Sequence, residues 1–315
     1  MTPTEGTAAK NIAWAFAGQG SQIPGMGKDI YEEYPQTRPI FESTAAGFDL
    51  KSLCFEASAE TLADTRYTQA SMAAFAAAAV LLLKEGGVGC DAALGLSLGE
   101  YSALHAAGVF DAEALLALLG FRGAIMADAS NVPSSMVAVF GLADEEVEAA
   151  AAQVASSTGA IVSCTNFNCP GQVVIGGDAD AVAASVKLLS ERGAKRCIPL
   201  NTSGPFHTAF MLKPGELLKA RLEETDLMPQ AFPVIFNATA ASAPDSEIRG
   251  LLVAQISSPV RFAQSILTLE GRGITDIIEV GPGKVLAGLI KKTAPSIKVT
   301  SIQTAADIKA IVEGW

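Results

Sequence analysis

Residues 95–99 read Gly95-Leu96-Ser97-Leu98-Gly99. They follow a short apolar run, Ala92-Ala93-Leu94, that predicts a strand, and they precede residues 100–107, which are typical of a helix. A serine with glycine two residues away on each side is the sequence form of a nucleophile elbow. The chain comes close to itself in such a turn, so side chains at the flanking positions would clash. The serine hydroxyl is then exposed, and the N–H of Leu98 can face a developing oxyanion.

The composition favours one large domain, or a large domain with a smaller insert. The chain has 315 residues, of which 50% are hydrophobic and 17% are charged, so a substantial core can be buried. Because 29 of the residues are glycine, the elbow spacing alone is weak evidence, and the strand and helix around it carry the prediction. The formal net charge of −11 argues against nucleic acid as a partner.

Cysteine usage and hydropathy indicate a soluble cytoplasmic protein. The five cysteines are scattered and none has CxxC spacing, so we expect reduced thiols and neither a disulfide framework nor a bound metal. The first residues lack a basic segment followed by a long apolar one, so we expect no signal peptide. The longest apolar run, residues 73–83, is too short to span a bilayer, and no membrane partner is expected.

The middle of the chain changes in character. Residues 130–202 predict a ferredoxin-like βαββαβ unit. Its elements are expected at 136–140 (strand), 144–155 (helix), 160–166 (strand), 172–176 (strand), 179–192 (helix) and 195–200 (strand). We therefore predict an α/β fold with a small subdomain over residues 130–202, inserted in a discontinuous large domain over residues 1–129 and 203–315.

A serine nucleophile needs an adjacent base, and the chain has only two histidines. His105 lies on the same predicted helix as Ser97, roughly 12 Å along its axis, and is better explained as a packed or surface residue. His207 lies in an irregular segment, residues 204–208, where the insert rejoins the large domain. A histidine at that junction is well placed to face a cleft, although a loop histidine satisfied by its neighbours is the alternative.

Seven motifs occur in order along the chain. They are Gly18-Gln19-Gly20-Ser21-Gln22, Gly95-Leu96-Ser97-Leu98-Gly99-Glu100-Tyr101, Phe121-Arg122-Gly123, Asn166-Phe167-Asn168-Cys169-Pro170-Gly171-Gln172, Phe206-His207, Gln255-Ile256-Ser257-Ser258-Pro259-Val260 and Glu279-Val280-Gly281-Pro282-Gly283. Together they resemble the malonyl-CoA:acyl carrier protein transacylases of type II fatty acid synthesis, over residues 13–292. This resemblance implies an α/β-hydrolase-like large domain with a ferredoxin-like insert.

The resemblance also assigns roles in catalysis. It implies that Ser97 is the acylated nucleophile and that His207 is its general base. A backbone carbonyl near Gln255 would orient the histidine, and no aspartate stands out as a third member of a triad. The backbone N–H groups of Gln19 and Leu98 would form the oxyanion hole, where each donor is worth about 3–4 kcal/mol in the transition state.

Two further residues would determine which acyl group the enzyme accepts. Arg122 lies in a helix rich in Leu, Ala and Gly, so its guanidinium is expected to project toward the cleft and pair with the malonyl carboxylate. A surface salt bridge is the alternative. Phe206 would leave no space for an α-methyl group, with a core phenylalanine as the alternative. Leu96 departs from the family, in which histidine is frequent before the nucleophile although some members carry leucine.

The asparagines and the carrier-docking surface are less specific. Asn166 and Asn168 are explained by turn formation alone, and Gly281-Pro282-Gly283 by a turn. Because the carrier protein is acidic in this family, docking requires a local basic patch. The candidates are Lys195 and Arg196 on the insert with Lys284, Lys291 and Lys292 on the large domain, and Lys187 and Arg192 beside them.

The sequence therefore predicts a ping-pong transfer of malonyl from malonyl-CoA to acyl carrier protein, by a monomer with no bound cofactor. A trans-acting malonyl acyltransferase of a polyketide synthase remains an alternative. So does a serine thioesterase or esterase, in which water is the acceptor. A non-catalytic module that binds the carrier protein is the alternative from another class.

Overall fold

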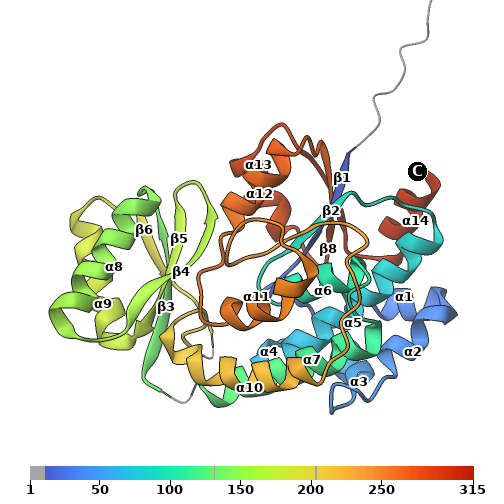
Figure 1. Ribbon diagram of the computed structural model, residues 1–315, viewed down its shortest axis with the longest axis horizontal. Coiled ribbons are helices and arrows are strands. Elements are labelled where there is room, and N and C mark those ends of the chain that lie inside the picture. Colours follow the sequence, from blue (N-terminus) through green and yellow to red (C-terminus); the bar gives the residue numbers. More distant parts are fainter. Residues whose placement is uncertain (1–10, 131, 203) are drawn as a thin grey trace, which may run out of the picture.

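The computed structural model describes residues 11–130, 132–202 and 204–315, which form two sheets side by side with their helices (Figure 1). The larger sheet has five parallel strands in the order β7-β2-β1-β8-β9. Its strands are β1 (Ile12–Phe16), β2 (Ala92–Gly95), β7 (Val234–Ile235), β8 (Asp276–Val280) and β9 (Lys298–Ile302).

Strand β1 shows how helices cover both faces of this sheet. All five of its residues are buried, as is typical of a central parallel strand. Trp14 and Phe16 point into one core, whereas Ala13 and Ala15 point into the other. The first core is closed by α5 (Thr65–Glu85), α6 (Gly99–Ala106), α7 (Ala112–Asp128), α10 (Leu212–Glu223), α11 (Ile248–Gln255) and α14 (Ala305–Glu313), and the second by α12 (Phe262–Gly271) and α13 (Val285–Thr293).

Helix α5 is longer than the apolar run within it. By length and composition it passes the test for a membrane-spanning helix, but 83% of its apolar window is buried inside the fold. Burial on nearly all sides indicates a core helix of this sheet. Helix α7 is capped by Asp111, whose side chain accepts a hydrogen bond from the N–H of Ala114 at 2.8 Å.

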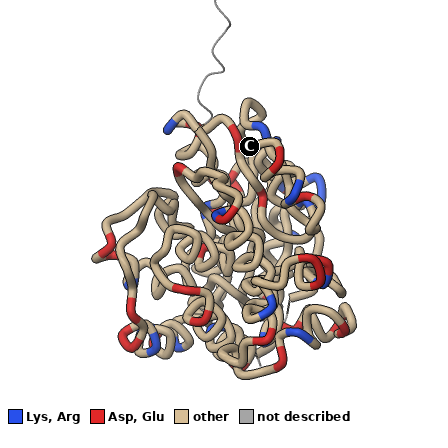
Figure 2. The backbone as a smooth tube through the Cα atoms, turned by 90° about the vertical axis from the view of Figure 1, so that its right-hand side faces the viewer, with Lys and Arg blue, Asp and Glu red and all other residues tan. Residues whose placement is uncertain are grey.

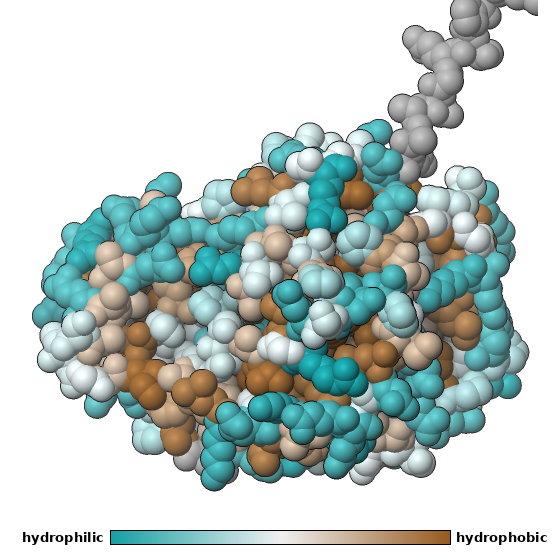
Figure 3. Space-filling model, in the orientation of Figure 1, coloured by the Kyte–Doolittle hydropathy of each residue, from teal (hydrophilic) through white to brown (hydrophobic). Residues whose placement is uncertain are grey.

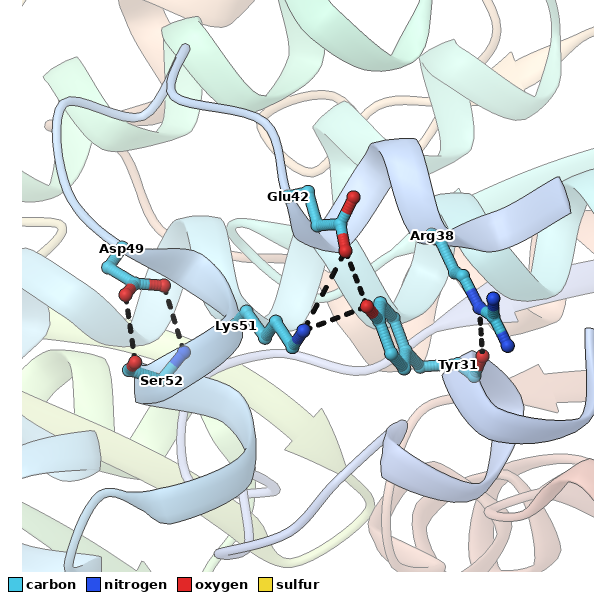
Figure 4. Close-up of polar contacts among 6 residues, drawn as sticks. All are labelled: Tyr31, Arg38, Glu42, Asp49, Lys51 and Ser52. Atoms are coloured by element: carbon cyan, nitrogen blue, oxygen red, sulfur yellow. Dashed lines mark hydrogen bonds and ion pairs between the residues drawn. The ribbon is translucent and has the colours of Figure 1, made fainter. Parts of the chain in front are cut away.

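Five short helices lie in residues 28–63 of the large domain, and Figure 4 shows Tyr31 with its polar neighbours in this region. They are α1 (Lys28–Glu33), η1 (Pro35–Thr37), α2 (Arg38–Phe41), α3 (Leu50–Glu56) and α4 (Ala59–Ala63). Helix α1 ends before Pro35, because a proline disfavours helix in the residue before it. The Tyr31 hydroxyl binds Glu42 and accepts from Lys51 Nζ at 2.8 Å, which ties α1 to α3.

The smaller sheet has the predicted βαββαβ order. Its antiparallel strands lie in the order β4-β5-β3-β6, the arrangement of a ferredoxin-like unit. The elements are β3 (Ser134–Phe140), α8 (Asp144–Thr158), β4 (Val162–Cys169), β5 (Gln172–Asp178), α9 (Ala179–Glu191) and β6 (Arg196–Pro199). Helices α8 and α9 cover its outer face, and β4 packs against α12 and α13 of the larger unit (Figure 1). The α/β fold class with a ferredoxin-like insert is confirmed.

One local prediction is corrected. Strand β4 continues to Cys169, so Asn166 and Asn168 lie within a strand and not in a turn. In the larger sheet, strand β7 has two residues, because Pro233 has no N–H to extend the ladder. The edge strand β9 was not predicted, since its alternating burial leaves only a weak apolar signal.

Charge and hydropathy are unevenly distributed over the surface. Basic and acidic residues are interspersed on the side that carries α14 (Figure 2). Apolar surface is visible where the small sheet meets α10 (Figure 3). Large apolar side chains exposed on or beside these elements are Ile198, Leu200, Leu212 and Leu217.

Candidate active site

The turn at residues 95–99 has the geometry of a nucleophile elbow. Strand β2 ends at Gly95 and α6 begins at Gly99, and Ser97 between them has a left-handed φ of 54°. A Cβ on Gly95 would lie 1.9 Å from the Gly99 carbonyl carbon, and a Cβ on Gly99 would lie 2.2 Å from the Phe16 carbonyl oxygen. Both glycines are therefore required by close approach of the backbone, as predicted from their spacing.

Ser97 opens into a cavity of about 290 Å³ between the two sheets, at the carboxyl ends of β1 and β2. This edge of a parallel sheet is where ligands bind in open α/β folds. The lining residues come from both units: Gln19, Gln69, Leu96, Ser97, Leu98, Arg122, Met126, Met136, Asn166, Asn168, Gln172, Val174, Leu200, Thr202, Phe206, His207, Val285 and Leu289.

His207 lies beside the serine. Its Nε2 is 2.8 Å from Ser97 Oγ, and its Nδ1 is 2.9 Å from the Gln255 carbonyl oxygen. Because a carbonyl only accepts, Nδ1 carries the proton and Nε2 is the acceptor for the serine hydroxyl. Burial, aided by the nearby Arg122 charge, lowers the His207 pKa to about 4. The imidazole is therefore neutral near pH 7 and able to take a proton.

Arg122 projects from α7 into the same site and is 1% exposed. Its Nη1 donates to Gln69 Oε1 at 2.6 Å, and its Nη2 donates to Gln255 Oε1 at 2.9 Å and to Ser97 Oγ at 3.3 Å. Its guanidinium carbon lies 5.3 Å from the centroid of the Tyr101 ring. Within the described part of the chain no carboxylate forms an ion pair with it, so the surface salt bridge considered from the sequence is wrong.

Two residues predicted to supply backbone donors lie at the cavity. Leu98 caps α6 and Gln19 follows β1, and both line the cavity. Neither N–H has a backbone or side-chain acceptor among the residues described, so both are free for a ligand. The Gln19 side chain is held by Thr65, with Nε2 2.9 Å from Oγ1. The Ser97 N–H, in contrast, already donates to Asn237 Oδ1 at 2.8 Å.

The other predicted residues divide between the cavity and the surface. Phe206 lines the cavity and is 6% exposed. His105 is remote from it and hydrogen bonds through Nδ1 to the Phe110 carbonyl at 2.9 Å. The predicted docking residues are exposed and lie on or next to β6 and α13: Lys195, Arg196, Lys284, Lys291 and Lys292. No group of His, Cys, Asp and Glu that could hold a metal occurs in the described ranges.

Sequence analysis missed several polar residues of the site. Gln69 binds Arg122, and its signal was an amide in an otherwise apolar helix. Asn166 and Asn168 line the cavity although they were attributed to turn formation, and Gln172, predicted as the first residue of a strand, lines it as well. Asn237 binds the nucleophile's backbone, but nothing in its local sequence distinguishes it.

A serine at an elbow, a neutral histidine and two free N–H donors are the parts that acyl transfer needs. The chain belongs to the acyl transferase domain family, which matches residues 13–311. It is therefore an acyltransferase.

Named relatives of this chain are similar over nearly their whole length. It is 39% identical over 308 residues to the malonyl CoA-acyl carrier protein transacylase of Bacillus subtilis, covering 96% of each chain. The protein of that name from Staphylococcus aureus is 38% identical over 305 residues, with 95% of this chain and 96% of that one covered.

Solved structures show the same architecture of a large and a small subdomain. The acyl carrier protein S-malonyltransferase of Vibrio cholerae matches with a TM-score of 0.92 and 36% identity, over 96% of this chain and all of that one (100%). A malonyl-transacylase solved in complex with its type II polyketide synthase acyl-carrier protein matches with a TM-score of 0.92 and 34% identity, covering 97% and 100%.

Proposed function

We propose that this acyltransferase moves a malonyl group from malonyl-CoA to the phosphopantetheine thiol of acyl carrier protein, through a malonyl-Ser97 intermediate. The observation that carries the proposal is the buried Arg122 guanidinium beside Ser97, whose hydrogen-bond acceptors among the described residues are all uncharged. A buried cation without a carboxylate partner favours an acyl group that brings its own carboxylate. The names of the relatives agree with this substrate.

In the first half-reaction, His207 Nε2 takes the hydroxyl proton as Ser97 Oγ attacks the thioester carbonyl. The tetrahedral oxyanion accepts hydrogen bonds from the N–H groups of Gln19 and Leu98. The C–S bond then breaks, and the proton on His207 passes to the departing CoA sulfur. This leaves malonate esterified to Ser97.

The second half-reaction reverses these roles. The phosphopantetheine thiol gives its proton to His207, and its sulfur attacks the ester carbonyl. The C–O bond to Ser97 breaks, and Oγ recovers the proton from the histidine. No cofactor is consumed in either half.

Arg122 and Phe206 would select the acyl group. A planar guanidinium binds a carboxylate with two parallel hydrogen bonds, and an acetyl group would leave that charge unpaired. Breaking a buried pair costs about 3–5 kcal/mol, which amounts to roughly a thousandfold preference for malonyl. The Phe206 ring would add selection against an α-methyl group, worth about 1–3 kcal/mol.

A polyketide synthase carrier protein is the second candidate for the acceptor. It is favoured by the structural similarity to the malonyl-transacylase that was solved with such a carrier protein. The same site chemistry serves fatty acid and polyketide carriers, because both present a phosphopantetheine thiol.

We also propose the domain boundaries of the enzyme, its docking surface, its oligomeric state and its location in the cell. The large domain comprises residues 1–129 and 203–315 and the insert residues 130–202, although residues 1–10, 131 and 203 are outside the described ranges. The carrier protein docks on the basic residues of β6 and α13 beside the cavity. The enzyme acts as a cytoplasmic monomer without nucleic acid or membrane partners, in keeping with its net charge of −11.

Intact mass spectrometry tests the proposal. Wild type, Ser97→Ala and Arg122→Ala are each mixed with malonyl-CoA and, separately, with acetyl-CoA. We expect a malonyl adduct on wild type that Ser97→Ala lacks, and a shift toward acetyl in Arg122→Ala. A wild type that acquires neither adduct, or that hydrolyses both as fast as they form, would overturn the transferase in favour of a hydrolase or a binding module.

A further inference from the structure

Asn237 lies directly behind the nucleophile elbow, just beyond the end of β7. Its side chain is fully buried, and it contacts the elbow at two points. Its Nδ2 donates to the Gly95 carbonyl at 2.7 Å, and its Oδ1 accepts from the Ser97 N–H at 2.8 Å. One carboxamide therefore binds the backbone on both sides of Leu96.

This pattern is that of a parallel β ladder. In such a ladder one residue donates to the carbonyl before its partner and accepts from the N–H after it. Strand β7 pairs with β2 through Val234 and Ile235 and then ends. The Asn237 carboxamide, which has the same donor and acceptor as a peptide group, continues that pairing across Leu96. On the other side, the Leu96 N–H donates to the Phe16 carbonyl of β1 at 3.0 Å.

The backbone of Asn237 is fixed by two further hydrogen bonds. The buried Glu100 carboxyl accepts a hydrogen bond from the Asn237 N–H at 2.5 Å, and the Arg261 N–H donates to the Asn237 carbonyl at 3.0 Å. Glu100 lies in the first turn of α6, the helix that follows the elbow. Asn237 is therefore bound to α6 through Glu100 and to the elbow that precedes α6 through its carboxamide. These contacts restrict the movement of Asn237 and of the elbow.

The elbow needs such support because Ser97 is held in a left-handed conformation that costs about 1–3 kcal/mol for a residue other than glycine. Its backbone groups are both bound by side chains. Asn237 Oδ1 accepts from its N–H, and Gln255 Nε2 donates to its carbonyl at 2.8 Å. Because the Ser97 N–H is committed to Asn237, it is not available to an oxyanion, whereas the N–H groups of Leu98 and Gln19 have no acceptor among the described residues.

We propose that Asn237 is a positioning residue for the nucleophile: its carboxamide replaces a missing strand residue and holds Ser97 in the strained conformation that aims Oγ at His207. This inference rests on the proposed function, which identifies the reaction as acylation of Ser97. Among the described residues Asn237 makes no direct hydrogen bond to Arg122, which would bind the acyl carboxylate; Gln255 lies between them, donating to Asn237 Oδ1 at 3.4 Å and accepting from Arg122 Nη2 at 2.9 Å. Loss of the carboxamide should therefore slow acylation without weakening the binding of malonyl-CoA.

The test compares wild type, Asn237→Asp, Asn237→Ala and the surface control Asn11→Asp. Asn237→Asp keeps the shape and an acceptor for the Ser97 N–H but loses the donor to the Gly95 carbonyl. Asn11 also donates to a carbonyl, that of Gly273 at 3.1 Å, but is exposed and far from the site. Single-turnover mass spectrometry measures the maximal acylation rate and the malonyl-CoA concentration that gives half of it, and thermal unfolding checks the fold.

We expect Asn237→Asp to reduce the maximal acylation rate by about 10²-fold, the effect of a small misplacement of a reacting group, with half-saturation changed less than about twofold. Asn11→Asp should behave as wild type. A folded Asn237→Asp with the wild-type rate, or with weakened half-saturation and an unchanged rate, would overturn the inference.

A neutral fluorophosphonate, which labels activated serines, separates this inference from the proposed function. If wild type is labelled by the probe but not by malonyl-CoA, the proposed substrate is wrong, and the probe rates of the variants still test the positioning. If Asn237→Ala fails to fold, Asn237→Asp carries the comparison. Equal probe rates in folded Asn237→Asp and wild type would contradict the role assigned to Asn237.

Discussion

The Nδ1 atom of His207 lies 2.9 Å from the backbone carbonyl oxygen of Gln255, and no carboxylate takes that place. A carbonyl fixes the tautomer and the ring orientation as an aspartate would, but it brings no negative charge to stabilise an imidazolium. Together with burial and the nearby Arg122, this explains a histidine whose pKa lies near 4. The site thus has a base that is fully available at neutral pH but only weakly basic.

The two histidines of the chain allow a direct test of the base. His207→Ala should reduce the acylation rate by about 10²–10⁴-fold, the usual contribution of general base catalysis. His105→Ala is the matched control, since His105 is remote from the cavity and should leave the rate within about twofold. Rates are measured by malonyl adduct formation. Equal losses in the two variants would contradict the assignment of His207.

The pH dependence of serine reactivity should follow the His207 pKa. Labelling of wild type by a neutral fluorophosphonate should stay constant above about pH 5.5 and fall only as the pH approaches 4. Because the Arg122 charge contributes to the low pKa, Arg122→Gln should move this acid limb upward, toward 6.5. If the labelling of wild type already fell with a midpoint at pH 6.5, His207 would be solvated and not buried.

The same pKa makes stability depend on pH. Between pH 4 and 6.5 the unfolded chain binds more protons at His207 than the folded chain, so stability is present at higher pH and is lost as the pH falls through this window. Going from near pH 7.5 to about pH 5 should cost wild type about 2 kcal/mol more than it costs His207→Gln. Urea unfolding of both proteins at the two pH values measures this difference. An identical pH dependence in the two proteins would contradict the shift.

Close approach at the elbow predicts a large difference between two glycines. Gly99→Ala would place a Cβ 2.2 Å from the Phe16 carbonyl oxygen, so we expect a loss of more than about 3 kcal/mol in unfolding free energy, or no folded protein. Gly250, within α11, has open space around it, and Gly250→Ala should stabilise by up to about 1 kcal/mol. Thermal unfolding of both variants measures this difference in stability. A Gly99→Ala protein as stable as wild type would show that the turn can open.

Docking of the carrier protein should depend on charge position and not on net charge. The double variants Lys195→Glu/Arg196→Glu and Lys291→Glu/Lys292→Glu should raise the KM for acyl carrier protein several-fold and leave malonyl-CoA kinetics unchanged. Lys219→Glu/Lys309→Glu makes the same change in net charge on exposed residues of α10 and α14, outside the proposed docking elements β6 and α13. Steady-state kinetics with both substrates measure the effect. An unchanged KM in both test variants, or an equal rise in the control, would exclude this surface.

Much of the fold follows from local patterns. The two flanking glycines identify the elbow because their requirement is steric and lies within five residues. The βαββαβ order of the insert follows from apolar periodicity, which depends on near neighbours only. The break at Pro35 and the short β7 were harder to place, because proline acts on hydrogen bonds that also depend on the surrounding structure.

The chemical identity of the site was accessible from the sequence through Ser97, His207 and Arg122, since each is a residue type whose chemistry is distinctive. The contacts among these three side chains could not be worked out from local patterns. They join α7, the elbow and the loop after β6, which are far apart along the chain. Only the tertiary structure revealed Gln69 and Asn237 as partners of the site, and it added the side-chain contacts of Gln255 to the backbone role expected of it. Amides have weak sequence signals, and their importance here arises from burial, where each donor and acceptor needs a partner.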